Sequence, residues 1–158
     1  MSEDNEHFMR RAIALAREGM RAGDGGPFGS VVVLNGEIVG EGNNCVTSSN
    51  DPTAHAEVVA IRNACKKIGS FDLSGAVVYT SCEPCPMCLA AIYWSRAESI
   101  YIAGDRHDAA RAGFDDAYIY QELTVDPEHR NVPIKQLLRE ESVAVFNEWI
   151  AKAGKVEY

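Results

Sequence analysis

Hydrophobic and polar residues recur along this chain with two periods, and each period predicts a different kind of element. In residues 6–22, apolar side chains return every three or four positions while arginines occupy the other faces, which is typical of an amphipathic helix. Short apolar runs bounded by turn-forming residues are typical of strands. The predicted strands are residues 30–34, 37–45, 76–81 and 99–103. Asn35-Gly36, between the first two strands, predicts a tight hairpin.

Two further helices are predicted from the residues at their starts. Asp51 can cap a helix that has Pro52 at its first position and runs to about Lys67. Pro86 likewise begins a short helix that ends near Arg96. Both helices follow a turn that contains proline.

The pattern is weaker in the last third of the chain. Residues 105–121 indicate short helical turns, and residues 143–153 indicate a terminal amphipathic helix. Residues 132–138 are compatible with a strand, although Pro133 restricts it to a sheet edge or to the start of a strand. Because strands alternate with helices, we expect an α/β domain with helices on both faces of a mixed sheet.

Length and charge narrow the class of function. A chain of 158 residues suits one domain, and such a domain buries about 70% of the surface of its unfolded chain. It needs neither metal nor disulfides merely to fold, so a metal site would serve chemistry. The formal net charge of −8 argues against a general nucleic-acid binder, which needs clustered Lys and Arg. Small neutral substrates remain compatible with this charge.

The sequence also bears on membranes and location. No apolar run approaches the roughly 18 residues that a membrane span needs. Residues 1–10 are acidic and polar, without the basic start and apolar centre of a secretory signal. We therefore expect no membrane partner and a cytoplasmic location.

The cysteines favour a metal or a catalytic site. There are five, an odd number, and three of them fall within seven residues. In a reducing compartment this indicates metal binding or catalysis rather than a disulfide framework. The three clustered residues could together supply three thiolates, but Cys82 follows a predicted strand, which favours a packing role. The five are Cys45, Cys65, Cys82, Cys85 and Cys88.

Two short segments carry the candidate chemistry. Cys85 and Cys88 are three residues apart in the first turn of a predicted helix, where the helix dipole favours thiolates. His55 and Glu57 lie near the start of another helix, where side chains lean past the helix end. Two such helix starts facing each other would bring His55, Cys85 and Cys88 around one tetrahedral zinc ion.

Three protein ligands leave one position of such a zinc open for water, as in catalytic sites. Bound zinc lowers the pKa of that water to about 7, and Glu57 beside it could carry a proton from water to substrate. Two alternatives stay open. Cys85-Pro86-Met87-Cys88 could be a redox motif, or the zinc could stabilise a binding module without catalysis. A purely structural zinc, however, needs no unligated carboxylate.

Four segments of the chain carry a family resemblance: residues 25–29, 50–57, 80–88 and 112–116. The second and third contain H-x-E and P-C-x-x-C, the pattern of zinc deaminases. The chain resembles the cytidine deaminase superfamily and, within it, the bacterial-type guanine deaminases. The first and fourth segments point to the guanine branch.

The resemblance implies a three-layer α/β/α fold around a mixed five-stranded sheet, with residues 1–158 forming a single domain. It also implies a homodimer that exchanges C-terminal segments, about residues 105–158. The implied reaction is zinc-dependent hydrolysis of guanine, a small purine base, to xanthine and ammonia, with no nucleic-acid partner. By position, His55, Cys85 and Cys88 are the implied zinc ligands and Glu57 is the implied proton shuttle.

Four more residues are implied to hold the base: Phe28, Asn44, Asp116 and Tyr158. Phe28 would stack on the ring and Asn44 would grip the purine edge, while Asp116 and Tyr158 would close the pocket. Guanine presents N1–H and a 2-amino group, so it needs acceptors such as Asp116, and an amide can both donate and accept. Each residue also has a structural alternative. Phe28 could be core, Asn44 could satisfy a loop, Asp116 could cap a turn, and Tyr158 lies at a terminus.

Related substrates remain in competition with guanine. A guanosine deaminase would carry similar segments and differ in admitting a ribose. Transfer-RNA adenosine deaminases share the zinc segments, but the acidic charge of this chain disfavours a polyanionic substrate. Residues 114–116 make a cytosine-type deaminase the weaker alternative.

Overall fold

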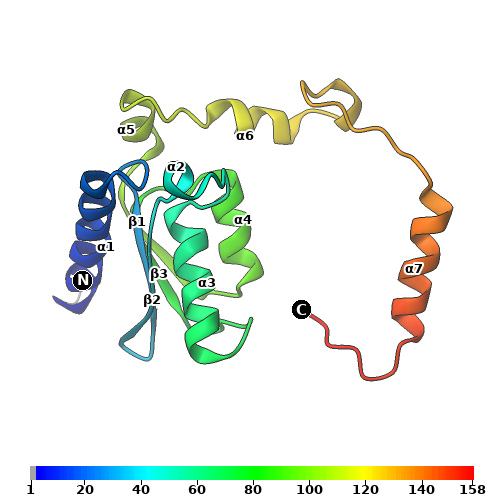
Figure 1. The fold of residues 1–158 in the computed structure, drawn as a ribbon, viewed down its shortest axis with the longest axis horizontal. Coiled ribbons are helices and arrows are strands. Elements are labelled where there is room, and N and C mark those ends of the chain that lie inside the picture. The colour runs from blue at the N-terminus through cyan, green and yellow to red at the C-terminus, as the bar shows by residue number, and fades with distance from the viewer. Residues whose placement is uncertain (1–2) are drawn as a thin grey trace. The chain divides into compact units, whose positions relative to one another are not determined.

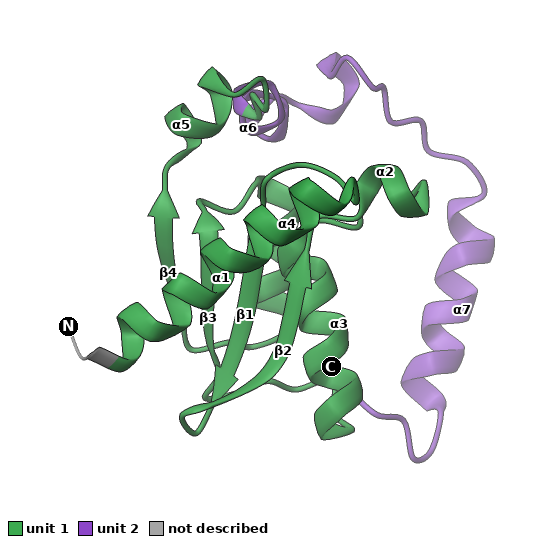
Figure 2. Ribbon diagram, turned by 60° about the vertical axis from the view of Figure 1, so that its left-hand side comes forward, with its two compact units in different colours: residues 1–116 green, residues 117–158 purple. Residues whose placement is uncertain are grey.

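The computed structural model describes residues 3–158 and divides the chain into two compact units, Met1–Asp116 and Ala117–Tyr158 (Figure 2). The first unit contains α1 (Glu3–Ala22), β1 (Gly29–Leu34), β2 (Glu37–Asn43), α2 (Val46–Ser49), α3 (Ala56–Ile68), β3 (Val77–Cys82), α4 (Pro86–Trp94), β4 (Ser99–Gly104) and α5 (Arg106–Arg111). The second contains α6 (Ala117–Thr124), a 3-10 turn (Pro127–His129) and α7 (Arg139–Ala151). A single domain over the whole chain stays a prediction.

The sheet of the first unit is mixed, with strand order β2-β1-β3-β4. Strand β1 is antiparallel to both β2 and β3, whereas β3 and β4 run parallel. The hairpin predicted at Asn35-Gly36 is confirmed, because both residues adopt positive φ angles, 53° and 80°. Such angles match the right-handed twist of paired strands.

The expected five-stranded sheet is wrong for the described chain, whose one sheet has four strands. The missing strand is residues 132–138, which form no regular element up to the start of α7. Pro133 has no N–H to donate to a ladder. The unit Ala117–Tyr158 also contains no strand with which this segment could pair within that unit.

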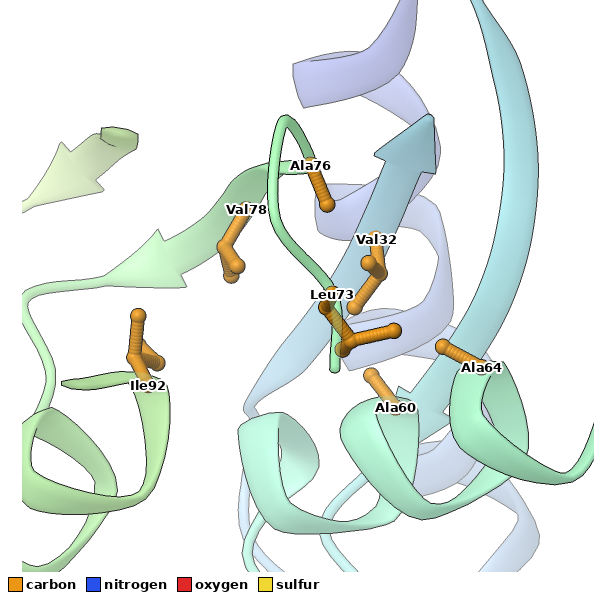
Figure 3. Close-up of a cluster of buried hydrophobic side chains, with 7 residues drawn as sticks. All are labelled: Val32, Ala60, Ala64, Leu73, Ala76, Val78 and Ile92. Carbon is orange, nitrogen blue, oxygen red and sulfur yellow. The ribbon is translucent and has the colours of Figure 1, made fainter. Parts of the chain in front are cut away.

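Helices cover both faces of the sheet, α1 on one and α3 with α4 on the other (Figure 1). Successive side chains of a strand point to opposite faces, so each face has its own apolar cluster. The α1 side contains Ala12, Leu15, Val31, Val33 and Tyr79. The other side contains Val32, Ala60, Ala64, Leu73, Ala76, Val78 and Ile92 (Figure 3). The first unit therefore has the expected three layers.

The second predicted helix begins later than expected. Asp51 does not cap it; its Oδ1 accepts hydrogen bonds from the backbone N–H (2.8 Å) and hydroxyl (2.7 Å) of Thr53. This local turn competes with helix formation. His55 is still extended (φ −70°, ψ 155°), and α3 begins at Ala56. His55 is thus the N-cap, and Glu57 lies in the first turn.

No helix within residues 3–158 combines the length and apolarity that crossing a bilayer requires.

Candidate metal centre and substrate site

Helices α3 and α4 begin with the same local arrangement. The N-cap residues, His55 and Cys85, are both extended, and neither side chain caps its own helix. Pro86 occupies the start of α4, where its fixed φ suits a first helical turn and its missing N–H is not needed. Each N-cap side chain is therefore free of the usual capping hydrogen bond and available to a site beyond the helix end.

The structure brings His55, Cys85 and Cys88 together. The Nδ1 atom of His55 lies 3.6 Å from Sγ of Cys85 and 3.5 Å from Sγ of Cys88, and all three donor atoms lie within 4.8 Å of one another. Zinc–sulfur and zinc–nitrogen bonds of about 2.3 and 2.0–2.1 Å at tetrahedral angles give N···S edges of about 3.6 Å. The donor atoms and their spacing therefore fit a zinc ion.

The electrostatics of the two thiols also suit a cation. The pKa of Cys85 is lowered to about 4, first by a hydrogen bond with Cys88 and then by His55. The pKa of Cys88 is raised by its hydrogen bond to Cys85 and by burial. The pair thus holds one thiolate and one proton. A bound divalent cation would favour the loss of that proton and a second thiolate.

Glu57 lies beside this group without belonging to it. Its side chain is only 6% exposed, and burial is the main reason that the pKa of its carboxyl is raised. Oε1 accepts a hydrogen bond from Oγ1 of Thr80 at 3.2 Å. A buried carboxyl next to a candidate metal group is the arrangement that proton transfer needs.

Cys82 is not part of the donor group. Its Sγ instead donates to the backbone carbonyl of Asp105 at 3.6 Å. Burial raises the pKa of this thiol to about 11, so it stays protonated at neutral pH. These contacts agree with the packing role expected for it, so the candidate donor group consists of His55, Cys85 and Cys88.

Phe28 and Asn44 lie on one loop system at the start of β1 and the end of β2. The ring of Phe28 is half-buried and meets Phe114 edge to face, with centroids 4.9 Å apart. Asn44 is buried, and its Oδ1 accepts the backbone N–H groups of Gly26 (3.3 Å) and Val46 (3.1 Å). Asn44 therefore does satisfy a loop, and within residues 3–158 the hydrogen bonds of its side chain use only Oδ1.

The last two predicted residues, Asp116 and Tyr158, differ in burial. Asp116 is half-buried, and its pKa is raised first by burial and also by the charge of Cys85. Tyr158 belongs to the unit Ala117–Tyr158 and is 73% exposed. Its role at the site stays a prediction.

Three residues around the site were not singled out from the sequence. Phe114 lies within a segment that carries the family resemblance, so that segment was a usable signal. Thr80, which donates to Glu57, is a buried polar residue in a strand whose first residues are apolar. Glu83 lies between Cys82 and Cys85. Its hydrogen-bond partner, Arg106, is 23 residues away in the sequence, so only the folded structure reveals the contact.

Comparison with known proteins agrees with this geometry. The family described as cytidine and deoxycytidylate deaminase zinc-binding region matches residues 2–104, which include both helix starts. The chain is 52% identical to guanine deaminase of Bacillus subtilis, over 98% of this chain and 99% of that protein. The structure also matches the X-ray structure of guanine deaminase from the same organism, with a TM-score of 0.95. This match covers 100% of this chain and 99% of that one.

A transfer-RNA deaminase matches less of the chain. The tRNA-specific adenosine deaminase of Bacillus subtilis is 40% identical over 63% of this chain and 61% of that protein. More than a third of this chain therefore lies outside that match. Because the family match spans more than half of the sequence, this chain belongs to the zinc-binding cytidine and deoxycytidylate deaminase family.

Proposed function

We propose that this protein is a zinc-dependent guanine deaminase that converts guanine and water to xanthine and ammonia. The observation that carries the proposal is a three-donor metal group with one buried, unligated carboxylate beside it. The likeness to guanine deaminase continues through both units of the chain, whereas the likeness to the transfer-RNA enzyme covers 63% of it.

His55 through Nδ1, and Cys85 and Cys88 through their sulfurs, would hold the zinc. Imidazole and thiolate are the ligands zinc prefers, and three of them are typical of a catalytic site. Zinc bound there would supply Lewis acidity and a nucleophile near neutral pH. A non-catalytic, zinc-stabilised module would have no use for the buried Glu57.

Glu57 is the proposed proton carrier. In the net reaction water adds oxygen to C2 of the base, and the amino group on C2 leaves as ammonia. Water must therefore lose protons, while a ring nitrogen and the departing amine must gain them. The carboxylate of Glu57 would take a proton at one oxygen and deliver it to those atoms.

Base recognition would fall to three residues of the first unit. Oδ1 of Asn44 is used by two backbone N–H groups, so its Nδ2 is the group left for substrate. Asn44 would therefore donate to a guanine acceptor rather than both donate and accept. Asp116 would accept from N1–H, and Phe28, steadied by the edge contact with Phe114, would stack on the ring.

The proposed active form is a cytoplasmic homodimer with exchanged C-terminal segments, about residues 105–158, in which Tyr158 helps to close a pocket. Support comes from the unit Ala117–Tyr158 taken by itself, because it leaves large apolar side chains exposed, as interfaces do. These include Leu137, Leu138, Val145, Phe146 and Ile150. Light scattering that gave only a monomer mass would contradict this part of the proposal.

The experiment that tests the proposed function offers zinc-loaded protein guanine, guanosine, adenine, cytosine and cytidine in parallel. Ammonia release and the ultraviolet change are measured, with zinc-loaded Glu57→Gln protein as the background control. Preferential turnover of guanine is expected. Turnover of guanosine alone would keep the chemistry but change the substrate. No turnover of any base with zinc bound would favour the non-catalytic module.

A further inference from the structure

One buried polar contact connects the central sheet to the proposed proton carrier. The hydroxyl of Thr80 on β3 donates to Oε1 of Glu57 on α3 at 3.2 Å. Thr80 is 1% exposed and Glu57 is 6% exposed, so water does not compete freely for either group. The contact lies on the face of the sheet that Val32 and Val78 otherwise make apolar (Figure 3).

We propose that Thr80 is a positioning residue whose hydroxyl holds the Glu57 carboxylate in the orientation from which it transfers protons. The proposal rests on the proposed deaminase function, because it gives Thr80 a purpose only if Glu57 moves protons. Thr80 itself touches neither substrate nor metal in this role.

The position of Thr80 is rigid for two reasons. Strand β3 is paired on both sides, with Ser30 opposite Thr80 on β1 and Ile102 opposite it on β4. A β-branched side chain in a strand also has few χ1 rotamers. A hydroxyl on such a residue is a fixed donor, whereas Glu57 has several rotatable bonds of its own.

The contact fixes one oxygen of the Glu57 carboxylate. Oε1 is held by Thr80, and the carboxylate also interacts with the Cys88 thiol of the donor group, so its orientation is set between the sheet and the metal donors. Without the donor, Oε1 would be buried with one partner fewer, which is costly for a carboxylate. The side chain would then gain by rotating toward another donor, and its alignment would be lost.

The proposal is tested with two substitutions at one position. Thr80→Val keeps the shape and the strand preference of the residue but removes the hydroxyl, and Thr80→Ser restores the hydroxyl. We expect Thr80→Val to keep its zinc and its fold while kcat falls about 10- to 100-fold, the usual effect of removing a supporting partner. KM should stay nearly unchanged, and Thr80→Ser should recover most of kcat.

Ser30→Ala is the matched control. Ser30 is fully buried and lies directly opposite Thr80, but its hydroxyl donates to the backbone carbonyl of Tyr79 at 3.1 Å, not to Glu57. Its loss removes a buried hydroxyl from the same face of the sheet. We expect a lower melting temperature for Ser30→Ala and a kcat like that of the unsubstituted protein.

A readout independent of activity is the infrared carboxylate band of Glu57, isolated by subtracting the spectrum of the Glu57→Gln protein. Thr80→Val should shift this band, and Ser30→Ala should not. The proposal is overturned by an unshifted band, by unchanged kcat in Thr80→Val, by equal kcat losses in Thr80→Val and Ser30→Ala, or by loss of zinc from Thr80→Val. Failure of the proposed function would instead appear as no guanine turnover in the unsubstituted protein, while the band still reports the contact.

Discussion

The carboxylate of Glu83 accepts three hydrogen bonds from Arg106. Oε1 receives Nε (3.0 Å) and Nη2 (2.5 Å), and Oε2 receives the backbone N–H (3.0 Å). The backbone N–H of Glu83 also donates to the carbonyl of Gly104 at 2.8 Å. These bonds join the segment that leads into Cys85 to the first residue of α5. They tie the loop after β3 to the loop after β4.

Arg106→Ala should therefore loosen the metal site as well as the fold. Hydrogen bonds to charged groups contribute about 1.5–3 kcal/mol, and because Arg106 is 39% exposed we expect a loss nearer 1 kcal/mol. Arg106→Lys should recover little, since lysine lacks the planar fork. Thermal unfolding and the rate of zinc removal by a chelator measure both effects.

The control for Arg106 lies on the same helix. Arg111 pairs with Asp108 in a contact whose side chains are 79% and 50% exposed. Arg111→Ala should change neither stability nor zinc release noticeably. Equal zinc-release rates in Arg106→Ala and the unsubstituted protein would show that the Arg106–Glu83 contact does not support the metal site.

Cys85→Ser should lose zinc and remain folded. The two apolar clusters lie on either face of the sheet and contain none of the three metal donors. The fold should thus survive with a lower melting temperature. Metal analysis measures the zinc content, and circular dichroism measures the fold. Cys65 lies outside the donor group, so Cys65→Ala is the control that should keep its zinc. Full zinc occupancy in Cys85→Ser would remove Cys85 from the ligand set.

Glu57→Gln should keep zinc and lose turnover. Glutamine fills the same volume but cannot accept and return a proton, and general acid–base catalysis contributes about 10²- to 10⁴-fold. The kcat for guanine and the zinc content are measured together. Glu98→Gln, at an exposed carboxylate, is the control. Unimpaired turnover by zinc-loaded Glu57→Gln protein would refute the assigned role.

Acid should weaken the contact between α1 and β2. Nε and Nη2 of Arg11 donate to the Glu41 carboxylate at 2.8 and 2.9 Å, and this hydrogen bonding lowers the pKa of Glu41 below its ordinary 4.5. A lowered folded pKa stabilises the protein above pH 4.5, and that contribution is lost as pH falls through the folded pKa. Glu41→Gln should therefore have a lower melting temperature at pH 7 and a shallower decline toward pH 3. If the melting temperatures of Glu41→Gln and the unsubstituted protein fell in parallel with pH, the Arg11–Glu41 contact would not be the cause.

Gly40 should tolerate no side chain. A Cβ there would lie 2.3 Å from the backbone oxygen of Ala60 and 2.7 Å from Cβ of Ala64. Because strand and helix backbones would both have to move, Gly40→Ala should cost about 1–3 kcal/mol or more. Denaturant unfolding measures the loss. Gly104→Ala, whose Cβ would meet its nearest atom at 3.5 Å, is the strand control.

Local patterns were sufficient for most elements of the first unit. The apolar runs of β1, β3 and β4, the Asn35-Gly36 hairpin and Pro86 at the start of α4 all depend on a few neighbouring residues. Those neighbours restrict φ and ψ directly, so sequence alone carries the information. The grouping of Cys85 and Cys88 is local for the same reason, since three residues make nearly one helical turn.

Competition between local contacts, and packing between distant segments, decided the rest. The start of α3 depends on whether Asp51 caps the helix or bonds Thr53, and both are locally acceptable. The strand expected at 132–138 depends on a neighbouring strand that its own unit does not contain.

What the sequence by itself determined was therefore the set of chemical groups and the short elements that carry them. The tertiary structure decided which groups meet. His55 lies 3.5 Å from Cys88 although 33 residues separate them, and Thr80 meets Glu57 across 23 residues. The first contact joins the starts of two helices, and the second joins a helix to the sheet on which it packs. No local preference encodes that, since it follows from burying two apolar faces at once.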